Sequence, residues 1–280
     1  MADVVVTTPR KKLSASAMTL FLKSPKAFYW AYIKRVQTAE QTVGSFDHDK
    51  IMGVLWSEFV DRFYKQVPEI SNTKKMLIDW DEQTQGWVSE KTRVKYRGAL
   101  ESWANTYYQM FDPSDGCRNG SEKLVENDRF MGYVDGLSHN LVLHEVKSTS
   151  RSPQLVGQLW KVQNSLQVKL YCVLTKATGI CIEFAWKDTP YGIYRSEVIP
   201  VTSQQLIAWE QELNTLADYI YSLGDDPNNY PCHPDGCCLI TKNITSLCQY
   251  QTLCEMGLDE TTKVLYKEKS SREPIPQEIK

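Results

Sequence analysis

Two carboxylates and one amine lie close together in the middle of the chain, in the segment GYVDGLSHNLVLHEVKS. Asp135 precedes a short polar stretch, and Glu145 and Lys147 follow it. A hairpin that turns at His139 would place Asp135 opposite Leu143 and diagonally beside Glu145. Lys147 would share that face, because side chains alternate along a strand. The segment therefore predicts that the three groups meet on a sheet, although a register slip of one residue would separate the two carboxylates.

These residue types are suited to the hydrolysis of a phosphodiester. Hard cations such as Mg²⁺ take oxygen ligands from one or two carboxylates and bind substrate phosphate with the remaining positions. A bound metal polarises the phosphoryl oxygen and lowers the pKa of a water molecule, and a nearby ammonium can orient that water or neutralise developing charge. The alternative is an exposed hairpin on which Glu145 and Lys147 form a same-face ion pair, because E-x-K is a common pattern.

Gln167 and Tyr171 are spaced four residues apart, which places them on one face of a predicted helix. The amide could bond a base or a phosphate, or could hold the catalytic lysine, and the phenol could stack or bond a phosphate. Taken alone, the pair fits a half-buried helix equally well.

The composition is that of an ordinary globular protein: 280 residues, 42% hydrophobic, 24% charged, with a formal net charge of -2. This charge argues against a protein that coats nucleic acid, but not against one that grips it locally. The first residues lack a long apolar stretch, and no segment approaches the roughly 20 apolar residues of a membrane span. We therefore expect a protein of the cytoplasm with no membrane partner.

The order of the predicted elements indicates an α/β domain with a mixed central sheet flanked by helices. Hydrophobic spacing predicts two short helices in residues 13–36, broken at Pro25, and helices at 51–66, 82–111, 154–176 and 202–223. Short runs rich in β-formers predict strands at 124–127, 129–137, 141–147, 179–186 and 191–199.

We expect one domain over residues 13–256, between a flexible N-terminus (1–12) and a polar tail (257–280). Its predicted parts are a helical part (13–111), a catalytic sheet with its helices (122–223) and a cysteine-rich segment (230–254).

Five of the eight cysteines crowd into the last fifth of the chain: Cys232, Cys237, Cys238, Cys248 and Cys254. Without an export signal, clustered cysteines favour a metal site over disulfides. Four thiolates could gather here around an iron–sulfur cluster or a structural Zn²⁺, and the spacing does not choose between them. The alternative is a set of free thiols in a loop.

Four motifs in order resemble those of the PD-(D/E)XK nuclease superfamily. Gly132-Tyr-Val-Asp135 is similar to its G-x-x-D strand, Glu145-Val-Lys147 to its E-x-K, and Gln167-Val-Lys-Leu-Tyr171 to its Q-x-x-x-Y. The opening LSASAMTLFLKSPKAFYWAY resembles the N-terminal segment of the RecB-like branch, which includes CRISPR-adaptation nucleases and phage exonucleases. The resemblance covers roughly residues 13–254 and implies a restriction-endonuclease-like core.

The same resemblance implies roles for the candidate residues. Asp135 and Glu145 would bind Mg²⁺ or Mn²⁺ with help from the Val146 carbonyl, and Lys147 would activate the nucleophilic water. The last two site residues, Gln167 and Tyr171, would complete the site and touch DNA. The implied activity is that of a deoxyribonuclease, an exonuclease serving recombination, replication or repair alongside the proteins of those processes. By the same resemblance it would be phage-encoded and would work in the host cytoplasm.

The chain departs from the family pattern at an early helix. Relatives often carry a metal-binding His in a G-x-x-x-H motif, whereas Gly53 is followed here by Ser57. Serine is a poor replacement for imidazole, and Glu58 could supply a carboxylate ligand instead. The departure also supports an alternative hypothesis, a nuclease fold that has lost its chemistry and binds DNA or a protein partner.

A second departure concerns the [4Fe–4S] cluster of many relatives. Ser24-Pro25 stands where they have Cys-Pro, and Thr245 stands at the first C-terminal cysteine position. Cys248 and Cys254 keep the family spacing. The cysteine-rich segment therefore matches the family only in part.

Overall fold

The computed structural model describes residues 12–38, 48–113, 123–149, 155–231, 253 and 266–268. The chain divides into two compact units, a larger one formed by Phe46–Leu213 and a smaller one formed by Met1–Ser45 with Asn214–Lys280. Among the helices of the described ranges, none has the length and apolar character needed to cross a bilayer.

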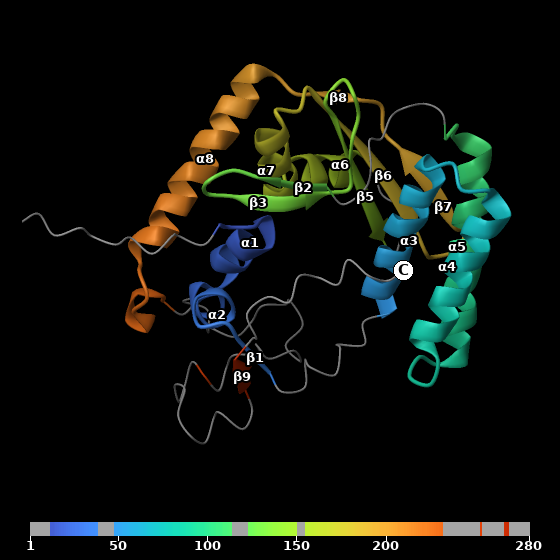
Figure 1. The fold of residues 1–280 in the computed structure, drawn as a ribbon, viewed down its shortest axis with the longest axis horizontal. Helices are drawn as coiled ribbons and strands as arrows, with labels where there is room; N and C mark the ends of the chain where they lie inside the picture. The colour runs from blue at the N-terminus through green and yellow to red at the C-terminus, as the bar shows by residue number, and fades with distance from the viewer. Residues whose placement is uncertain are drawn as a thin grey trace, which may run out of the picture. The chain divides into compact units, whose positions relative to one another are not determined.

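A five-stranded mixed sheet is the centre of the larger unit (Figure 1). It consists of β4 (Gly136–Leu137), β5 (Val142–Thr149), β6 (Gly179–Trp186) and β7 (Gly192–Arg195) in that order, and β8 (Ile199–Pro200) also pairs with β6. β5 and β6 are parallel, and the other pairs are antiparallel. β6 is buried along nearly its whole length, which explains why its sequence is apolar apart from Glu183. The predicted mixed sheet is confirmed.

Three helices, α3 (His48–Tyr64), α4 (Glu69–Thr84) and α5 (Glu90–Met110), form the first helical layer of this unit (Figure 1). Their core holds Trp56, Trp80 and Trp103. Ala185 of β6 belongs to the same core, and Val146 of β5 packs against it. The helices therefore cover the face of β5 that carries Val146.

α6 (Leu155–Gln163) and α7 (Leu166–Thr175) pack on the opposite face of the sheet. The Ser165 hydroxyl caps α7 by accepting a hydrogen bond from the Val168 N–H at 3.3 Å. α7 also contacts a two-stranded antiparallel sheet of β2 (Lys123–Glu126) and β3 (Met131–Val134). This helix therefore contacts β3, the strand that precedes Asp135, and β5, the strand that carries Glu145.

The smaller unit begins with α1 (Ala15–Lys23), α2 (Pro25–Phe28) and a π-helical turn, η1 (Tyr29–Ile33). Ser24 ends α1 and caps α2, with Pro25 in the first turn, so the predicted break at this proline is confirmed. β1 (Val36–Thr38) pairs with β9 (Tyr266–Glu268). α8 (Ser203–Ser222) starts in the larger unit, ends in the smaller one, and is followed by a short 3₁₀ turn, η3 (Pro227–Asn229).

Two predicted helix boundaries were wrong. The predicted helix over 82–111 begins inside α4, most of which was not predicted as a helix. Gly86, at φ +87°, separates α4 from α5, and Ser89 caps the new helix. The predicted helix over 154–176 divides into α6 and α7 because Ser165 starts a new helix.

The predicted hairpin register was also wrong, by two residues. Gly136 pairs with His144 and Leu137 with Leu143, so Asp135 does not lie opposite Leu143. The Ser138 hydroxyl sets this loop by accepting a hydrogen bond from the Val142 N–H at 3.0 Å. A shift of two residues leaves every side chain on its predicted face, because the period of a strand is two.

Candidate active site

Asp135 occupies a bend between β3 and β4, where the chain passes from one sheet to the other. Its Oδ2 accepts a hydrogen bond from the Val146 backbone N–H at 2.9 Å. Extending the β4–β5 register by one residue brings Asp135 level with Glu145. The bend thus fixes one carboxylate against the strand that carries the other.

Glu145 lies on the face of β5 that alternates away from Val146, and its side chain has no exposed surface. The Lys147 amine pairs with the Glu145 Oε1, and it also donates a hydrogen bond to the Gln167 Oε1 at 3.1 Å. The Lys147 side chain remains 35% exposed. The amine is therefore held between a buried carboxylate and an amide while solvent can still reach it.

Tyr171 completes this group one helical turn after Gln167. Burial and, to a lesser degree, the negative charges of Glu145 and Asp135 together raise the pKa of Tyr171 to about 12, while a hydrogen bond with Gln167 opposes the shift. The phenol consequently keeps its proton at neutral pH and can act as a hydrogen-bond donor.

Gly132, the first residue of the G-x-x-D motif, lets the Tyr171 ring approach β3. A Cβ atom at position 132 would lie 2.3 Å from Tyr171 Cε1. The motif glycine and the motif tyrosine therefore depend on each other for packing.

The structure brings together Asp135, Glu145, Lys147, Gln167 and Tyr171, the five predicted catalytic residues. Two carboxylates and the neighbouring backbone of Val146 provide oxygen donors, the ligand type that Mg²⁺ and Mn²⁺ prefer. This donor set, beside an amine that solvent can reach, fits a hard divalent cation. The individual roles remain predictions.

Glu58, the predicted substitute ligand, lies on α3. α3 packs on the Val146 face of β5, where Gly53 meets the Ser148 hydroxyl. The Glu58 carboxylate pairs with Arg62 of the same helix at 3.5 Å. The described contacts do not bring Glu58 to Asp135 or Glu145. Ser57, in the histidine position, has a buried hydroxyl without a hydrogen-bond partner.

The five predicted cofactor cysteines, Cys232, Cys237, Cys238, Cys248 and Cys254, lie outside the described residues. Neither their arrangement nor their ligand is tested by the structure.

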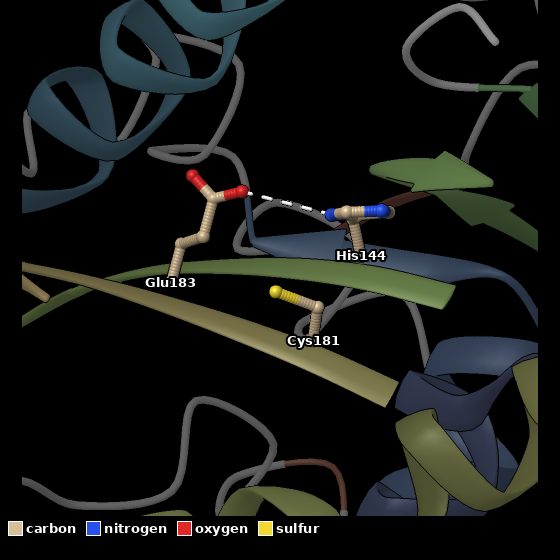
Figure 2. A group of neighbouring side chains, drawn as sticks. All are labelled: His144, Cys181 and Glu183. Atoms are coloured by element: carbon tan, nitrogen blue, oxygen red, sulfur yellow. Dashed lines mark ion pairs between the residues drawn. The ribbon is translucent and has the colours of Figure 1, made fainter. Parts of the chain in front are cut away.

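A second polar group, not predicted from the sequence, lies on the other face of the sheet. His144, Cys181 and Glu183 converge there (Figure 2). The sequence did carry a signal for it, because His144 alternates with Glu145 along β5, and Cys181 and Glu183 are two residues apart in an otherwise apolar strand. Only the pairing of β5 with β6 brings the three together.

Comparisons with known proteins were made for the whole chain. No curated protein matches it. A crystal structure of a presumed exonuclease from Eubacterium rectale is 13% identical, with a TM-score of 0.45, and the match covers 81% of this chain and 88% of that one. The structure of SSO0001 is also 13% identical, with a TM-score of 0.24, and covers 51% of this chain and 86% of that one.

The family comparison is more extensive. The model of the PD-(D/E)XK nuclease superfamily matches residues 12–255, which include all three central motifs. The matched range contains the strands and the helix that carry the converging side chains. This chain belongs to the PD-(D/E)XK nuclease superfamily.

Proposed function

We propose that this protein is a metal-dependent deoxyribonuclease whose active site is formed by Asp135, Glu145, Lys147, Gln167 and Tyr171. The observation that carries the proposal is the position of the Lys147 amine, which contacts both the buried Glu145 carboxylate and the Gln167 amide. A surface ion pair would not need a fully buried carboxylate or a second polar partner from another element.

The proposed roles follow from these contacts. Asp135 and Glu145 hold Mg²⁺ or Mn²⁺ together with the Val146 carbonyl. When bound, the metal would polarise the phosphoryl oxygen of the substrate and lower the pKa of a bound water molecule. Lys147 orients the attacking water and neutralises developing negative charge, Gln167 fixes the position of the amine, and Tyr171 donates its proton in a hydrogen bond to a phosphate oxygen.

We further propose that the enzyme is an exonuclease of recombination, replication or repair, of the phage type, as its sequence resemblance implies. The test compares a linear duplex with a covalently closed circle of the same sequence. An exonuclease shortens the linear DNA from its ends and leaves the circle intact. Cleavage of both substrates at equal rates would contradict exonuclease action while leaving the nuclease proposal in place.

The position of Ser57 favours a second candidate, a nuclease fold that binds DNA without cutting it. Its hydroxyl is buried in the place where relatives often have a metal-binding His. Glu58 remains the proposed substitute ligand. If the Glu58→Gln variant cleaves DNA with the same dependence on metal concentration as the wild type, Glu58 is not a ligand. Tight DNA binding with no cleavage under Mg²⁺ or Mn²⁺ would favour the second candidate.

The cysteine-rich segment is proposed to hold an iron–sulfur cluster or a structural Zn²⁺, which would stabilise the C-terminal region without performing the cleavage. Brown protein that bleaches on oxidation would indicate iron–sulfur, and metal analysis would detect zinc. Protein that contains neither iron nor zinc would support the alternative, in which these cysteines are free thiols.

A further inference from the structure

Three potential metal ligands gather on the sheet face opposite the proposed active site (Figure 2). His144 of β5 pairs in register with Cys181 of β6, and Glu183 follows two residues later on β6. Side chains with this spacing point to one face, because the strand period is two. All three residues are almost fully buried, with exposed fractions of 3–4%.

The ligand atoms are arranged closely enough for one ion. One ligand atom from each side chain lies within 4.8 Å of the other two. His144 Nδ1 is 3.7 Å from Glu183 Oε1, too long for a hydrogen bond. It is close to the roughly 3.3 Å that separates two ligands of a tetrahedral zinc ion with bonds of about 2.0–2.1 Å.

The His144 ring supplies an independent observation. Its Nδ1 is buried and has no hydrogen-bond partner. Such an atom is costly to bury unless something binds it. In this position Nδ1 faces a carboxylate and a thiol, which are the other two ligand types that zinc accepts.

The surroundings of Glu183 orient it for such a site. The Tyr107 hydroxyl donates a hydrogen bond to Glu183 Oε2 at 2.7 Å, which turns Oε1 toward His144. Hydrogen bonds of this kind to a ligating carboxylate are usual around protein metals. Arg195 Nε also lies 3.3 Å from Glu183 Oε1, so one positive charge is already present.

The charged groups around the site can compensate the charge of a bound divalent ion. Cys181 releases its thiol proton to water as the metal–sulfur bond forms. The thiolate and the Glu183 carboxylate then balance the ion, and the charge of Arg195 is left over, with its guanidinium 3.5 Å from the centre of the Phe111 ring. Arg195 thus weakens the site without removing a ligand.

We propose that His144, Cys181 and Glu183 form a Zn²⁺ site, distinct from the Mg²⁺ or Mn²⁺ site on the other face. A thiolate with an imidazole selects zinc over the harder cations. The ion would tie β5 to β6 directly behind Glu145, and would leave its fourth position to a water molecule.

Cobalt binding tests the proposal, because a thiolate bound to Co²⁺ gives an intense charge-transfer band that oxygen ligands do not give. The full-length protein is stripped with a chelator and titrated with Co²⁺ as wild type, Cys181→Ala and Cys172→Ala. Cys172 is the matched control, a buried free cysteine of α7 outside the cluster. Any ion held by the C-terminal cysteines or by the proposed active site contributes equally to all three proteins.

We expect Cys181→Ala to lose one cobalt equivalent per chain together with its charge-transfer intensity, and Cys172→Ala to match the wild type. Equal cobalt binding by Cys181→Ala and wild type would overturn the proposal. If Cys181→Ala does not fold, thiol alkylation of the wild type decides. Zn²⁺ should lower the extent of alkylation of Cys181 relative to that of Cys172 at least about tenfold. An unchanged ratio of the two would overturn the proposal.

Discussion

In the proposed site, the positive charge of Lys147 compensates the buried negative charge of Glu145. A fully buried carboxylate is costly unless a cation and further hydrogen bonds compensate it. Lys147 supplies that cation, and Gln167 holds Lys147 in place. The same contacts that stabilise the fold thus keep an amine beside two potential metal ligands.

At position 132 we predict that Ala impairs both packing and cleavage. The added Cβ would lie 2.3 Å from the Tyr171 ring, so Tyr171 must move or β3 must shift. We expect a loss of about 1–3 kcal/mol in the free energy of unfolding and a lower rate of DNA cleavage. Urea unfolding and a cleavage assay measure the two effects.

Gly157→Ala is the control for this variant. A Cβ at Gly157 of α6 meets no atom within 4 Å, so this change should keep or raise stability by about 0.5–1 kcal/mol. Equal stability of the two variants would show that Gly132 is not needed for the Tyr171 ring.

Tyr171 should make stability depend on pH in the alkaline range. Its pKa is about 12 in the folded protein against 10.0 ordinarily, so the unfolded chain loses this proton first as pH rises. The contribution is complete below pH 10 and disappears between pH 10 and 12, and we expect it to reach about 2 kcal/mol at most. Urea unfolding of wild type and Tyr171→Phe at several pH values should show a smaller alkaline loss for the variant.

Tyr133→Phe serves as the comparison, because Tyr133 is an exposed residue of β3. It should follow the wild-type pH dependence. An alkaline loss of stability that is the same in Tyr171→Phe and wild type would contradict the assignment to Tyr171.

Among the helices, one buried amide joins three elements of the first layer. Asn72 of α4 donates hydrogen bonds to the Phe59 carbonyl of α3 at 3.0 Å and to the Tyr108 hydroxyl of α5 at 3.1 Å. It also accepts one from Arg62 Nε at 2.8 Å. This single side chain fixes the relative positions of α3, α4 and α5.

We predict that Asn72→Leu destabilises the protein by about 2–3 kcal/mol, because it leaves buried polar groups without partners. Asn105→Ala removes an exposed amide of α5 and should change the free energy of unfolding by less than about 0.5 kcal/mol. Thermal or urea unfolding of both variants gives the comparison. An Asn72→Leu protein as stable as Asn105→Ala would rule out the bridging role.

Local patterns predicted some elements well and others poorly. The predicted strand over 179–186 has the bounds of β6, because a buried strand is a largely apolar run between polar breaks. The predicted strand over 191–199 divides into β7 and β8, and residues 196–198 between them are not part of a strand. The predicted face shared by Glu145 and Lys147 was correct since alternation needs only a strand.

Features set by side-chain hydrogen bonds or by distant pairing could not be predicted. The hairpin register depends on the hydrogen bond accepted by the Ser138 hydroxyl and on the backbone of Leu141 at φ +61°. Neither feature can be predicted without the three-dimensional structure of the loop. His144 meets Cys181 because β5 and β6 pair in parallel across an intervening pair of helices. The single-domain prediction over 13–256 is not tested, although the contacts divide the chain into two units.

At the scale of the whole molecule, the central sheet lies between the two proposed sites. Glu145 and Lys147 point toward α7, whereas His144 and the residues paired with it point toward the layer of α3, α4 and α5. A change on one face should therefore affect DNA cleavage, and a change on the other should affect mainly metal content and stability.

The most direct test of the account is the digestion of end-labelled linear DNA by wild type, Lys147→Ala and Lys65→Ala, with Mn²⁺ and with EDTA. Lys65 directly follows α3 and pairs with Asp61 of that helix, outside the proposed site, and so controls for the loss of a lysine. Circular dichroism confirms that each protein is folded.

We predict cleavage by wild type and Lys65→Ala with Mn²⁺, none with EDTA, and a rate at least about 100-fold lower for folded Lys147→Ala. Wild-type rates from Lys147→Ala, or cleavage that persists in EDTA, would contradict the proposed site.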